Sequence, residues 1–431
     1  MFENILKYIK VSKMENINFD CYNHVYNLLS DEDRISLSLT CLKFLEYSYD
    51  LRLSHNYEYI KDLLRYDLFY DINNYDYDKD SLKNLNSLKN LNNLKKLNLY
   101  NNYSIDMSTI NLPSSITELD CSCCEIEDGK FLEKLNNLKK LDISNNYNNN
   151  ISTINLPSSI IELDCSDSNI EDFKFLENLI NLKKLDISCN NNNNISSINL
   201  PSSITELDCN YCNIDFKFLE KLNNLKKLDI SNNYNNNIYT INLPSSIIEL
   251  DCSDSNIEDF KFLENLINLK KLDISCNNNN NISSINLPSS ITELDCNYCN
   301  IDFKFLEKLH NLKKLNISNN KNSNISSINL PSSIIELYCY SCDIKDFKFL
   351  EKLHNLKKLN IFNNKKSNIS FINLSSSITE LDCRSCNIKD FKFLEKLINL
   401  KKLNMSWNIN SNISYINLPL NITKLDYSNL L

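Results

Sequence analysis

Leucines recur at a fixed interval along most of this 431-residue chain, and that recurrence limits its fold more than any other feature. The second leucine of each L-x-x-L-x-(L/I/C) run marks sixteen copies between Leu97 and Leu425, spaced by 22 residues and in two places by 21. Residues 154–240 and 241–327 are nearly the same text, which indicates a tandem duplication. A unit this short cannot bury its own apolar face, so its copies must stack on one another. We therefore expect an elongated array over residues 81–431.

Two kinds of unit alternate along the array. One reads LKKLDISCN over residues 182–190, and the other reads LPSSITELDCNYC over residues 200–212. Both resemble the leucine-rich repeat, whose pattern is L-x-x-L-x-L-x-x-(N/C) in units of 20–29 residues. The resemblance implies an α/β solenoid: a right-handed horseshoe of about sixteen 22-residue coils with parallel strands on its concave face.

The residues of a unit predict its strand and the bend that follows. Alternate side chains of a strand face opposite sides, so Leu185 and Ile187 should point inward while Lys184 and Asp186 face outward. Asn190 should turn inward and satisfy backbone groups at the bend, which would form a ladder from coil to coil.

The return path differs between the two kinds of unit. Residues 173–182 have apolar residues at helical spacing, which predicts a helix on the convex side. Residues 191–203 contain Pro201 and little periodicity, which favours an extended or turn-like path.

Composition and charge exclude several classes of function. One glycine, Gly129, cannot supply a Gly-rich phosphate loop, a dinucleotide fingerprint or a nucleophile elbow, and four scattered histidines offer no catalytic triad. The net charge of −9 argues against a nucleic-acid surface. No apolar run is long enough to span a membrane, and the N-terminus lacks a signal peptide. We expect a monomeric cytoplasmic protein that is not an enzyme and has no cofactor, membrane or nucleic-acid partner.

The 17 cysteines include five Cys-x-x-Cys pairs, a spacing that often indicates zinc. In the pair Cys209 and Cys212, however, the first stands where the other kind of unit has isoleucine, and the second stands where it has the ladder asparagine. Both should therefore point into the core. Pairs two coils apart would be about 10 Å from one another, too far for a shared zinc site or for disulfides between pairs. We predict buried, reduced thiols and no metal site.

The outward strand positions define the concave face of the predicted solenoid. Lysine and glutamate alternate at the first outward position, and aspartate fills the second in nine successive coils, from Asp120 to Asp295. A column of like charge costs stability or favours cations and basic segments. Copying of one successful unit is the alternative explanation.

Beyond residue 330 the copies diverge at their outward positions. Aromatic and arginine side chains replace polar ones on three successive strands, and a tryptophan follows. Such side chains are typical of the residues that dominate binding at interfaces. We predict that they bind a protein partner on the concave face, whereas drift near the end of the array is the alternative. The predicted binding residues are Tyr338, Tyr340, Phe362, Arg384 and Trp407.

The N-terminal segment differs from the array. Residues 30–33 read SDED, a capping-box-like helix start, and apolar residues lie on both sides of them. We predict a small helical segment over residues 1–60 and an acidic, tyrosine-rich connector over residues 61–80, with residues 50–80 holding a helix and the connector.

The arrangement of these helices resembles an F-box, with paired leucines, an acidic turn and then LSLTCLKF over residues 37–44. It departs from the family at Asn18-Phe19, where Leu-Pro is usual, and at Phe44, which stands near the usual tryptophan. The resemblance implies docking to the adaptor subunit of a cullin–RING ubiquitin ligase, and a generic helical cap for the solenoid is the alternative. The implied docking residues are Leu28, Leu29, Leu37 and Leu39.

The whole chain resembles the F-box-like and leucine-rich-repeat proteins of mimivirus-type giant DNA viruses. It shares their Asn/Ile/Lys-rich composition, and the unit LPSSITELDCS over residues 112–122 is similar to theirs and to the FNIP repeats of amoebal and giant-virus proteins. The resemblance implies a substrate-recruiting adaptor in the host cytoplasm that holds its target on the concave face. The alternative is an interaction scaffold with no link to ubiquitin.

Overall fold

The computed structural model describes most of the repeat array and short parts of the N-terminal segment. The described residues are 24–25, 28–29, 54–56, 71–73, 94–102, 110–147, 153–190, 195–234, 238–277, 286–321, 324–409, 411 and 415–430. The chain divides into two compact units, Met1–Asn190 (unit 1) and Asn191–Leu431 (unit 2). Both units are built from the same kind of coil, and each coil is named below by its strand.

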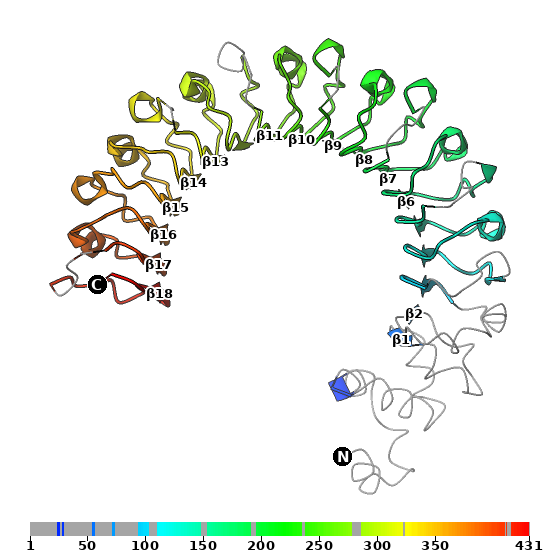
Figure 1. The fold of residues 1–431 in the computed structure, drawn as a ribbon, viewed down its shortest axis with the longest axis horizontal. Coiled ribbons are helices and arrows are strands. Elements are labelled where there is room, and N and C mark those ends of the chain that lie inside the picture. Colours follow the sequence, from blue (N-terminus) through cyan, green and yellow to red (C-terminus); the bar gives the residue numbers. More distant parts are fainter. Residues whose placement is uncertain are drawn as a thin grey trace, which may run out of the picture. The chain divides into compact units, whose positions relative to one another are not determined.

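Unit 1 holds seven strands within its described residues, and each pairs in parallel with the next along the chain (Figure 1). The strands are β1 (Ser54–Asn56), β2 (Asp71–Asn73), β3 (Lys96–Asn98), β4 (Glu118–Asp120), β5 (Lys140–Asp142), β6 (Glu162–Asp164) and β7 (Lys184–Asp186). Two 3-10 helices, η4 (Lys130–Lys134) and η6 (Lys174–Asn178), follow β4 and β6.

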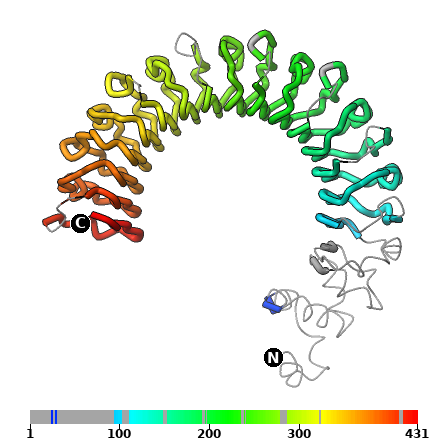
Figure 2. The backbone as a smooth tube through the Cα atoms, viewed as in Figure 1, coloured from blue at the N-terminus to red at the C-terminus, as the bar shows by residue number. Residues whose placement is uncertain are grey.

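Unit 2 continues the pattern with eleven parallel strands in its described part. Figure 2 shows the coils of this unit following one another along an arc. The strands are β8 (Glu206–Asp208), β9 (Lys227–Asp229), β10 (Glu249–Asp251), β11 (Lys271–Asp273), β12 (Glu293–Asp295), β13 (Lys314–Asn316), β14 (Glu336–Tyr338), β15 (Lys358–Asn360), β16 (Glu380–Asp382), β17 (Lys402–Asn404) and β18 (Lys424–Asp426).

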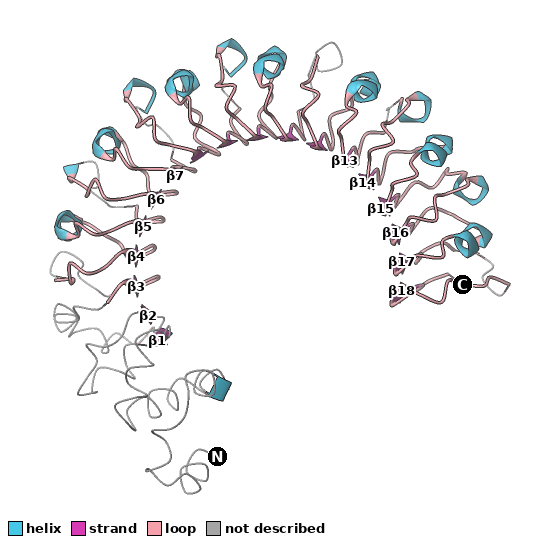
Figure 3. Cartoon of the chain, turned by 180° about the vertical axis from the view of Figure 1, so that it is seen from behind, coloured by secondary structure: helices cyan, strands magenta, loops and turns pink. Residues whose placement is uncertain are grey.

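The 3-10 helices of unit 2 lie on the side away from the strands (Figure 3). Five of those described have five or six residues: η8 (Phe216–Lys221), η10 (Lys261–Asn265), η12 (Phe303–Lys308), η14 (Lys348–Lys352) and η16 (Lys392–Lys396). Four have three residues: η7 (Ile195–Ser197), η9 (Ile238–Thr240), η13 (Ile325–Ser327) and η15 (Ile369–Phe371). The two lengths alternate because the two kinds of unit alternate.

The core consists of the inward side chains of stacked coils, as predicted. Leu185 and Ile187 are 3% and 0% exposed, whereas Lys184 on the same strand is exposed. Each of the described longer return paths except that of η4 adds a fully buried phenylalanine, such as Phe347, whose ring lies 5.8 Å from that of Phe349. Burying a phenylalanine side chain stabilises a fold by about 2–3 kcal/mol, so these rings anchor the helical side of the coils.

The predicted asparagine ladder is confirmed. Asn190 is fully buried, and its side-chain amide donates to the carbonyl of Ile187 in its own coil and to that of Cys165 in the preceding coil, both at 2.9 Å. Its oxygen accepts the backbone N–H of Ile170 at 3.0 Å. Each ladder asparagine therefore joins two coils through backbone groups that would otherwise be buried without partners.

Asparagine and several other residue types adopt the left-handed backbone conformation that glycine usually adopts. The residue three positions after each of strands β3 to β18 has positive φ, and Asn145, Asn232 and Asn363 are examples with φ of 57°, 57° and 59°. Asparagine tolerates this left-handed conformation better than other residues with a Cβ atom. Gly129 has φ of −86° and is not used in this way.

The structure confirms the fold prediction, because β3 to β18 are the sixteen coils of a leucine-rich-repeat solenoid. Three details differ from expectation. The strands β1 and β2 lie within residues 50–80, where a helix and a connector are predicted. The longer return helices are 3-10 helices. The segment 191–203, predicted to be extended or turn-like, contains the short helix η7.

Candidate partner-binding surface

The outward side chains of the strands, with the second residue after each strand, form a surface that we call the strand face. Lysine and glutamate alternate at its first position and form ion pairs between neighbouring coils. In unit 2, Lys358 lies 2.9 Å from Glu336 and Lys402 lies 3.0 Å from Glu380. These pairs are largely solvent-exposed, so each contributes only about 0–1 kcal/mol.

The aspartates at the second position have a structural role that the sequence pattern did not reveal. The Oδ1 atom of Asp251 accepts the backbone N–H of Ser253 at 3.0 Å and its hydroxyl at 2.7 Å. This arrangement closes the turn that leaves the strand. Asparagine serves equally well, since Asn404 accepts the same two bonds from Ser406. The column is therefore a row of turn caps.

Burial among the stacked caps raises the pKa of Asp142, Asp229, Asp273 and Asp295. Burial, followed by the charge of Asp295, raises the pKa of Asp273 to about 7, although hydrogen bonds from Ser275 oppose the shift. In unit 1, burial chiefly raises the pKa of Asp142 to about 6. The column thus carries less negative charge near neutral pH than its composition suggests.

Tyr338 interrupts this pattern. It ends β14, and the other strands from β1 to β18 that the structure describes all end in Asp or Asn. A phenol cannot cap the turn as a carboxylate does, and the Tyr338 hydroxyl instead lies 3.2 Å from the Glu336 carboxylate, to which it donates. Tyr338 is half-buried. This coil has therefore lost a local stabilising contact at an outward position.

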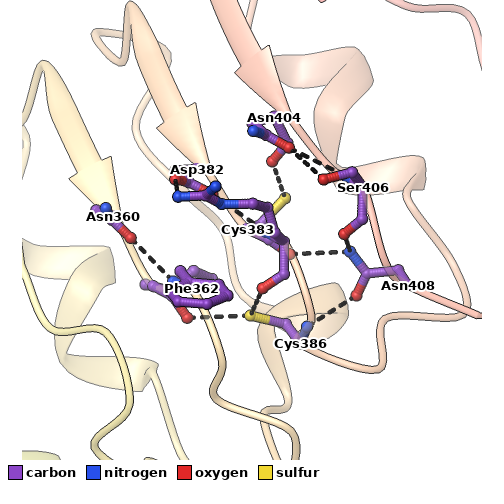
Figure 4. A network of polar contacts seen from close by, with 10 residues as sticks. Asn360, Phe362, Asp382, Cys383, Cys386, Asn404, Ser406 and Asn408 are labelled. Carbon is purple, nitrogen blue, oxygen red and sulfur yellow. Dashed lines mark hydrogen bonds and ion pairs between the residues drawn. The ribbon is translucent and has the colours of Figure 1, made fainter. Parts of the chain in front are cut away.

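Beside Tyr338, three successive coils carry a stack of side chains that we call the aromatic row: Tyr340, Phe362 and Arg384. The rings of Tyr340 and Phe362 lie 6.3 Å apart, and the Arg384 guanidinium carbon lies 4.7 Å from the centre of the Phe362 ring. Arg384 also binds both carboxylate oxygens of Asp382, at 3.0 Å and 2.9 Å. Figure 4 shows Phe362 beside Asp382 on this surface. The row is thus held in place before any partner binds.

Trp407 does not extend the aromatic row. It lies three residues beyond β17 with φ of 58°, and 56% of it is exposed. Within the described residues Trp407 makes no ring contact with the row. The structure therefore brings three of the five predicted binding residues into contact, while Tyr338 lies two residues before Tyr340 in the same coil and Trp407 is a separate exposed aromatic.

The predicted adaptor-docking leucines are only partly described. Leu28 is 75% exposed and donates its backbone N–H to the carbonyl of Val25 at 3.0 Å, and Leu29 is half-buried. Leu37 and Leu39 lie outside the described residues. Leu28 is thus an exposed apolar side chain on the N-terminal segment.

The cysteine pairs lie in the core, as predicted. Cys209 and Cys212 are both fully buried. In the later pairs Cys342 and Cys386 donate to backbone carbonyls of the preceding coil, and burial raises the pKa of both thiols to about 12. Among the described residues no group of three or more His, Cys, Asp or Glu side chains is arranged to hold a metal ion. In the same residues no helix is long and apolar enough to cross a membrane.

No family model and no curated protein sequence matches this chain. Solved structures with a similar fold include an internalin, InlF, from Listeria monocytogenes (21% identity, 79% of this chain and 82% of that one, TM-score 0.40). A leucine-rich-repeat protein from Leptospira interrogans is 20% identical over 86% of this chain and 93% of that one, with a TM-score of 0.49. TLR13, solved in complex with ssRNA13, is 19% identical over 88% of this chain and 65% of that one, with a TM-score of 0.48.

Proposed function

We propose that the protein is a non-catalytic recognition module that binds a protein partner on the strand face of coils β14 to β16. The observation that carries the proposal is the aromatic row. Three neighbouring coils exchange a small polar residue for Tyr340, Phe362 and Arg384, and these side chains stack on one another. Rigid aromatic and arginine side chains at the centre of a surface are the usual hot spots of protein interfaces.

Inward positions of these coils keep the repeat pattern whereas outward positions depart from it, and this difference favours selection for binding over random sequence drift. The inward residues of the same coils keep the repeat pattern, since Leu337, Leu359 and Leu381 are at most 2% exposed. At outward positions the coil of β14 has lost its turn cap, because Tyr338 stands where the other strands have aspartate or asparagine, whereas the backbone N–H of Phe362 still donates to Asn360 at 3.0 Å. Loss of the β14 cap lowers stability without improving the core, so a gain in binding is the better explanation.

The test is capture of a partner by the full chain and by variants that restore the repeat's own residues. Tyr340→Ser and Phe362→Ser place serine where coils such as β10 and β11 already carry it, so both variants should fold. We expect them to lose the partner. The matched control is Phe371→Ser, which removes an aromatic residue that is 87% exposed in η15, outside the aromatic row. Partner retention by the row variants, or equal loss in the control, would refute the assignment.

A second candidate function concerns the N-terminal segment, and the exposure of Leu28 favours it. The mechanism comes from the resemblance to an F-box. The segment would dock the adaptor subunit of a cullin–RING ubiquitin ligase in the cytoplasm, and the strand face would present the target protein to the ligase. We expect the purified full chain to bind that adaptor and the Leu28→Asp variant not to bind it. Leu420→Asp, at a fully exposed leucine in unit 2, is the control. No binding by the unmodified chain leaves a scaffold without a ubiquitin link.

A further inference from the structure

The coils that carry the aromatic row also depart from the repeat in the segment between each strand and the return helix. In coils β13 to β16 these segments hold seven lysines and three aspartates over residues 319–324, 341–348, 363–368 and 385–392. In coils β9 to β12 the equivalent segments hold two lysines and four acidic residues over residues 232–237, 254–261, 276–281 and 298–304. The excess charge of these segments therefore changes from negative to positive at β13.

Five of the lysines replace uncharged or acidic residues of other coils, and we call them the lysine edge: Lys321, Lys345, Lys365, Lys366 and Lys389. Two of them reverse a charge, because Lys345 and Lys389 stand where the coils of β6 and β10 carry Glu171 and Glu258. All five are exposed, and among the described residues none of them forms an ion pair, unlike the lysines of the strand face. The lysine edge thus presents positive charge to solvent.

Hydrogen bonds between coils hold these segments side by side. The backbone N–H of Asn368 donates to the carbonyl of Lys345 at 3.1 Å. On the other side, the Ser370 hydroxyl donates to the carbonyl of Asp390 at 2.8 Å, next to Lys389. Since Asn368 and Ser370 closely follow the two lysines of the β15 coil, lysines of three neighbouring coils lie on one continuous surface.

The lysine edge lies close to the aromatic row. Lys365 follows Phe362 by three residues, and Lys345 follows Tyr340 by five. Three residues of extended chain span about 10 Å, so a partner bound on the row reaches the edge with a short segment. Both sets of exchanges fall in the same coils, which indicates that one partner contacts both surfaces.

We propose that the lysine edge binds an acidic segment of this protein partner, an inference that rests on the proposed function. Exposed ammonium groups attract carboxylates as point charges. Single-stranded nucleic acid is usually bound with its bases stacked on aromatic side chains, but the aromatic residues of these four segments, Phe347 and Phe391, are fully buried. The acidic segments of the preceding coils would also repel a long polyanion. A short acidic peptide therefore fits the edge better than a nucleic acid does.

The experiment measures binding of fluorescein-labelled heptaglutamate to the full chain at low ionic strength by fluorescence anisotropy. We expect binding that weakens as salt is added. The double variant Lys345→Glu/Lys389→Glu should weaken it about tenfold or more. This variant should fold, because the coils of β6 and β10 already carry glutamate at the same position.

The matched control is Lys226→Glu/Lys270→Glu, which makes the same charge change at exposed positions directly before β9 and β11. It should weaken heptaglutamate binding less than about twofold. A labelled oligothymidylate of seven nucleotides tests the other class of anion and should bind less tightly than heptaglutamate.

Three outcomes overturn the inference: no binding of heptaglutamate, an equal loss in the control variant, and tighter binding of the oligothymidylate. These outcomes are distinguishable from failure of the proposed function, which is tested by capture of a partner through Tyr340 and Phe362. A partner whose capture depends on those two residues but not on Lys345 and Lys389 would uphold the aromatic row and refute the acidic segment. Heptaglutamate binding that depends on the two lysines, with a partner that does not need the row, would refute the proposed function and leave the edge as a site for acidic peptides.

Discussion

Arg384 lies over the ring of Phe362, with 4.7 Å between the guanidinium carbon and the ring centre, although the two residues belong to neighbouring coils. The same guanidinium binds both oxygens of Asp382, which follows the inward Leu381 of its own strand. Phe362 in turn packs beside Tyr340. Side chains at the outer surface thus connect three coils at positions where most other coils carry serine or asparagine.

Replacing Arg384 by lysine should weaken this connection even though the charge is kept. Lysine is a point charge and can neither bind Asp382 with two parallel bonds nor lie flat on Phe362. We expect Arg384→Lys to lower the free energy of unfolding by about 0.5–1 kcal/mol, measured by urea denaturation. Lys389→Arg, at an exposed site, should change nothing measurable. If the urea midpoint of Arg384→Lys equals that of the wild type, the contact of Arg384 with Phe362 and Asp382 contributes no stability.

The aspartate column should make stability depend on pH. Asp273 has its pKa raised by burial and by Asp295 from the ordinary 3.8 to about 7. A carboxyl group with a raised pKa binds its proton more tightly in the folded state, so its stabilising contribution is fully present below about pH 4 and is lost as the pH rises to about 7. We expect Asp273→Asn to stabilise the protein at pH 8, on the order of 1–2 kcal/mol after allowance for solvent screening.

The control for this pH experiment is Asp426→Asn. The pKa of Asp426 is lowered by hydrogen bonds from Ser428, so the sign of its contribution is opposite. This variant should bring no gain at pH 8. Thermal unfolding of both variants between pH 4 and pH 8 gives the comparison, and an Asp273→Asn variant that follows the wild type at every pH would contradict the account.

Replacing a ladder asparagine by alanine should lower the stability of the fold far more than replacing an asparagine outside the ladder. The Asn364 amide donates to the carbonyls of Cys339 and Ile361, both at 2.8 Å, and its oxygen accepts the N–H groups of Cys342 and Ile344. Alanine would leave these buried groups without partners, at a cost of about 3 kcal/mol or more.

Two further variants sharpen the test of the ladder. Asn373→Ala removes an exposed side chain that accepts one bond of 3.2 Å from Lys396, so its effect should stay within about 0.5 kcal/mol. Asn364→Cys imitates the alternate coils and should fall between alanine and the wild type, because a thiol can donate one bond to a carbonyl but replaces neither accepted bond well. Urea midpoints give the order, and equal values for Asn364→Ala and Asn373→Ala would refute the role of the ladder.

The phenylalanines divide sharply between core and surface. Phe347 is fully buried between coils, whereas Phe371 is 87% exposed. Phe347→Ala should cost about 3–5 kcal/mol because it leaves a cavity that the stacked coils cannot fill. Phe371→Ala should cost less than about 0.5 kcal/mol. Thermal denaturation followed by circular dichroism measures both, and similar losses would mean that the burial pattern is wrong.

The positions of the coils could be predicted almost to the residue. The regularly spaced leucines are the strongest pattern in the sequence, and their burial is also the main contribution to the stability of the array. Every leucine counted from Leu97 to Leu425 is the central residue of a strand, since only inward side chains repeat at a constant interval. The ladder role of Asn190 and the burial of Cys209 followed from their place relative to those leucines.

What could not be predicted depends on local geometry or on single substitutions. The turn-capping role of Asp251 is a hydrogen bond two residues along the chain, which no periodicity reveals. The strands β1 and β2 read SHN and DIN, so they lack the paired leucines that mark the other coils. The predicted binding residues could be chosen because they break the pattern, but which of them touch one another, and that Trp407 lies apart, required coordinates.

The central claim is that the aromatic row binds a protein partner, and photo-crosslinking from a residue of the row tests it most directly. A photoreactive phenylalanine analogue at position 362, with the same analogue at position 371 as the control, places one probe in the aromatic row and the other in η15. The account predicts that a protein partner becomes crosslinked from position 362 and not from position 371, and that Tyr340→Ser abolishes the product. Equal crosslinking from both positions, or from position 371 alone, would contradict the claim that the row is the binding surface.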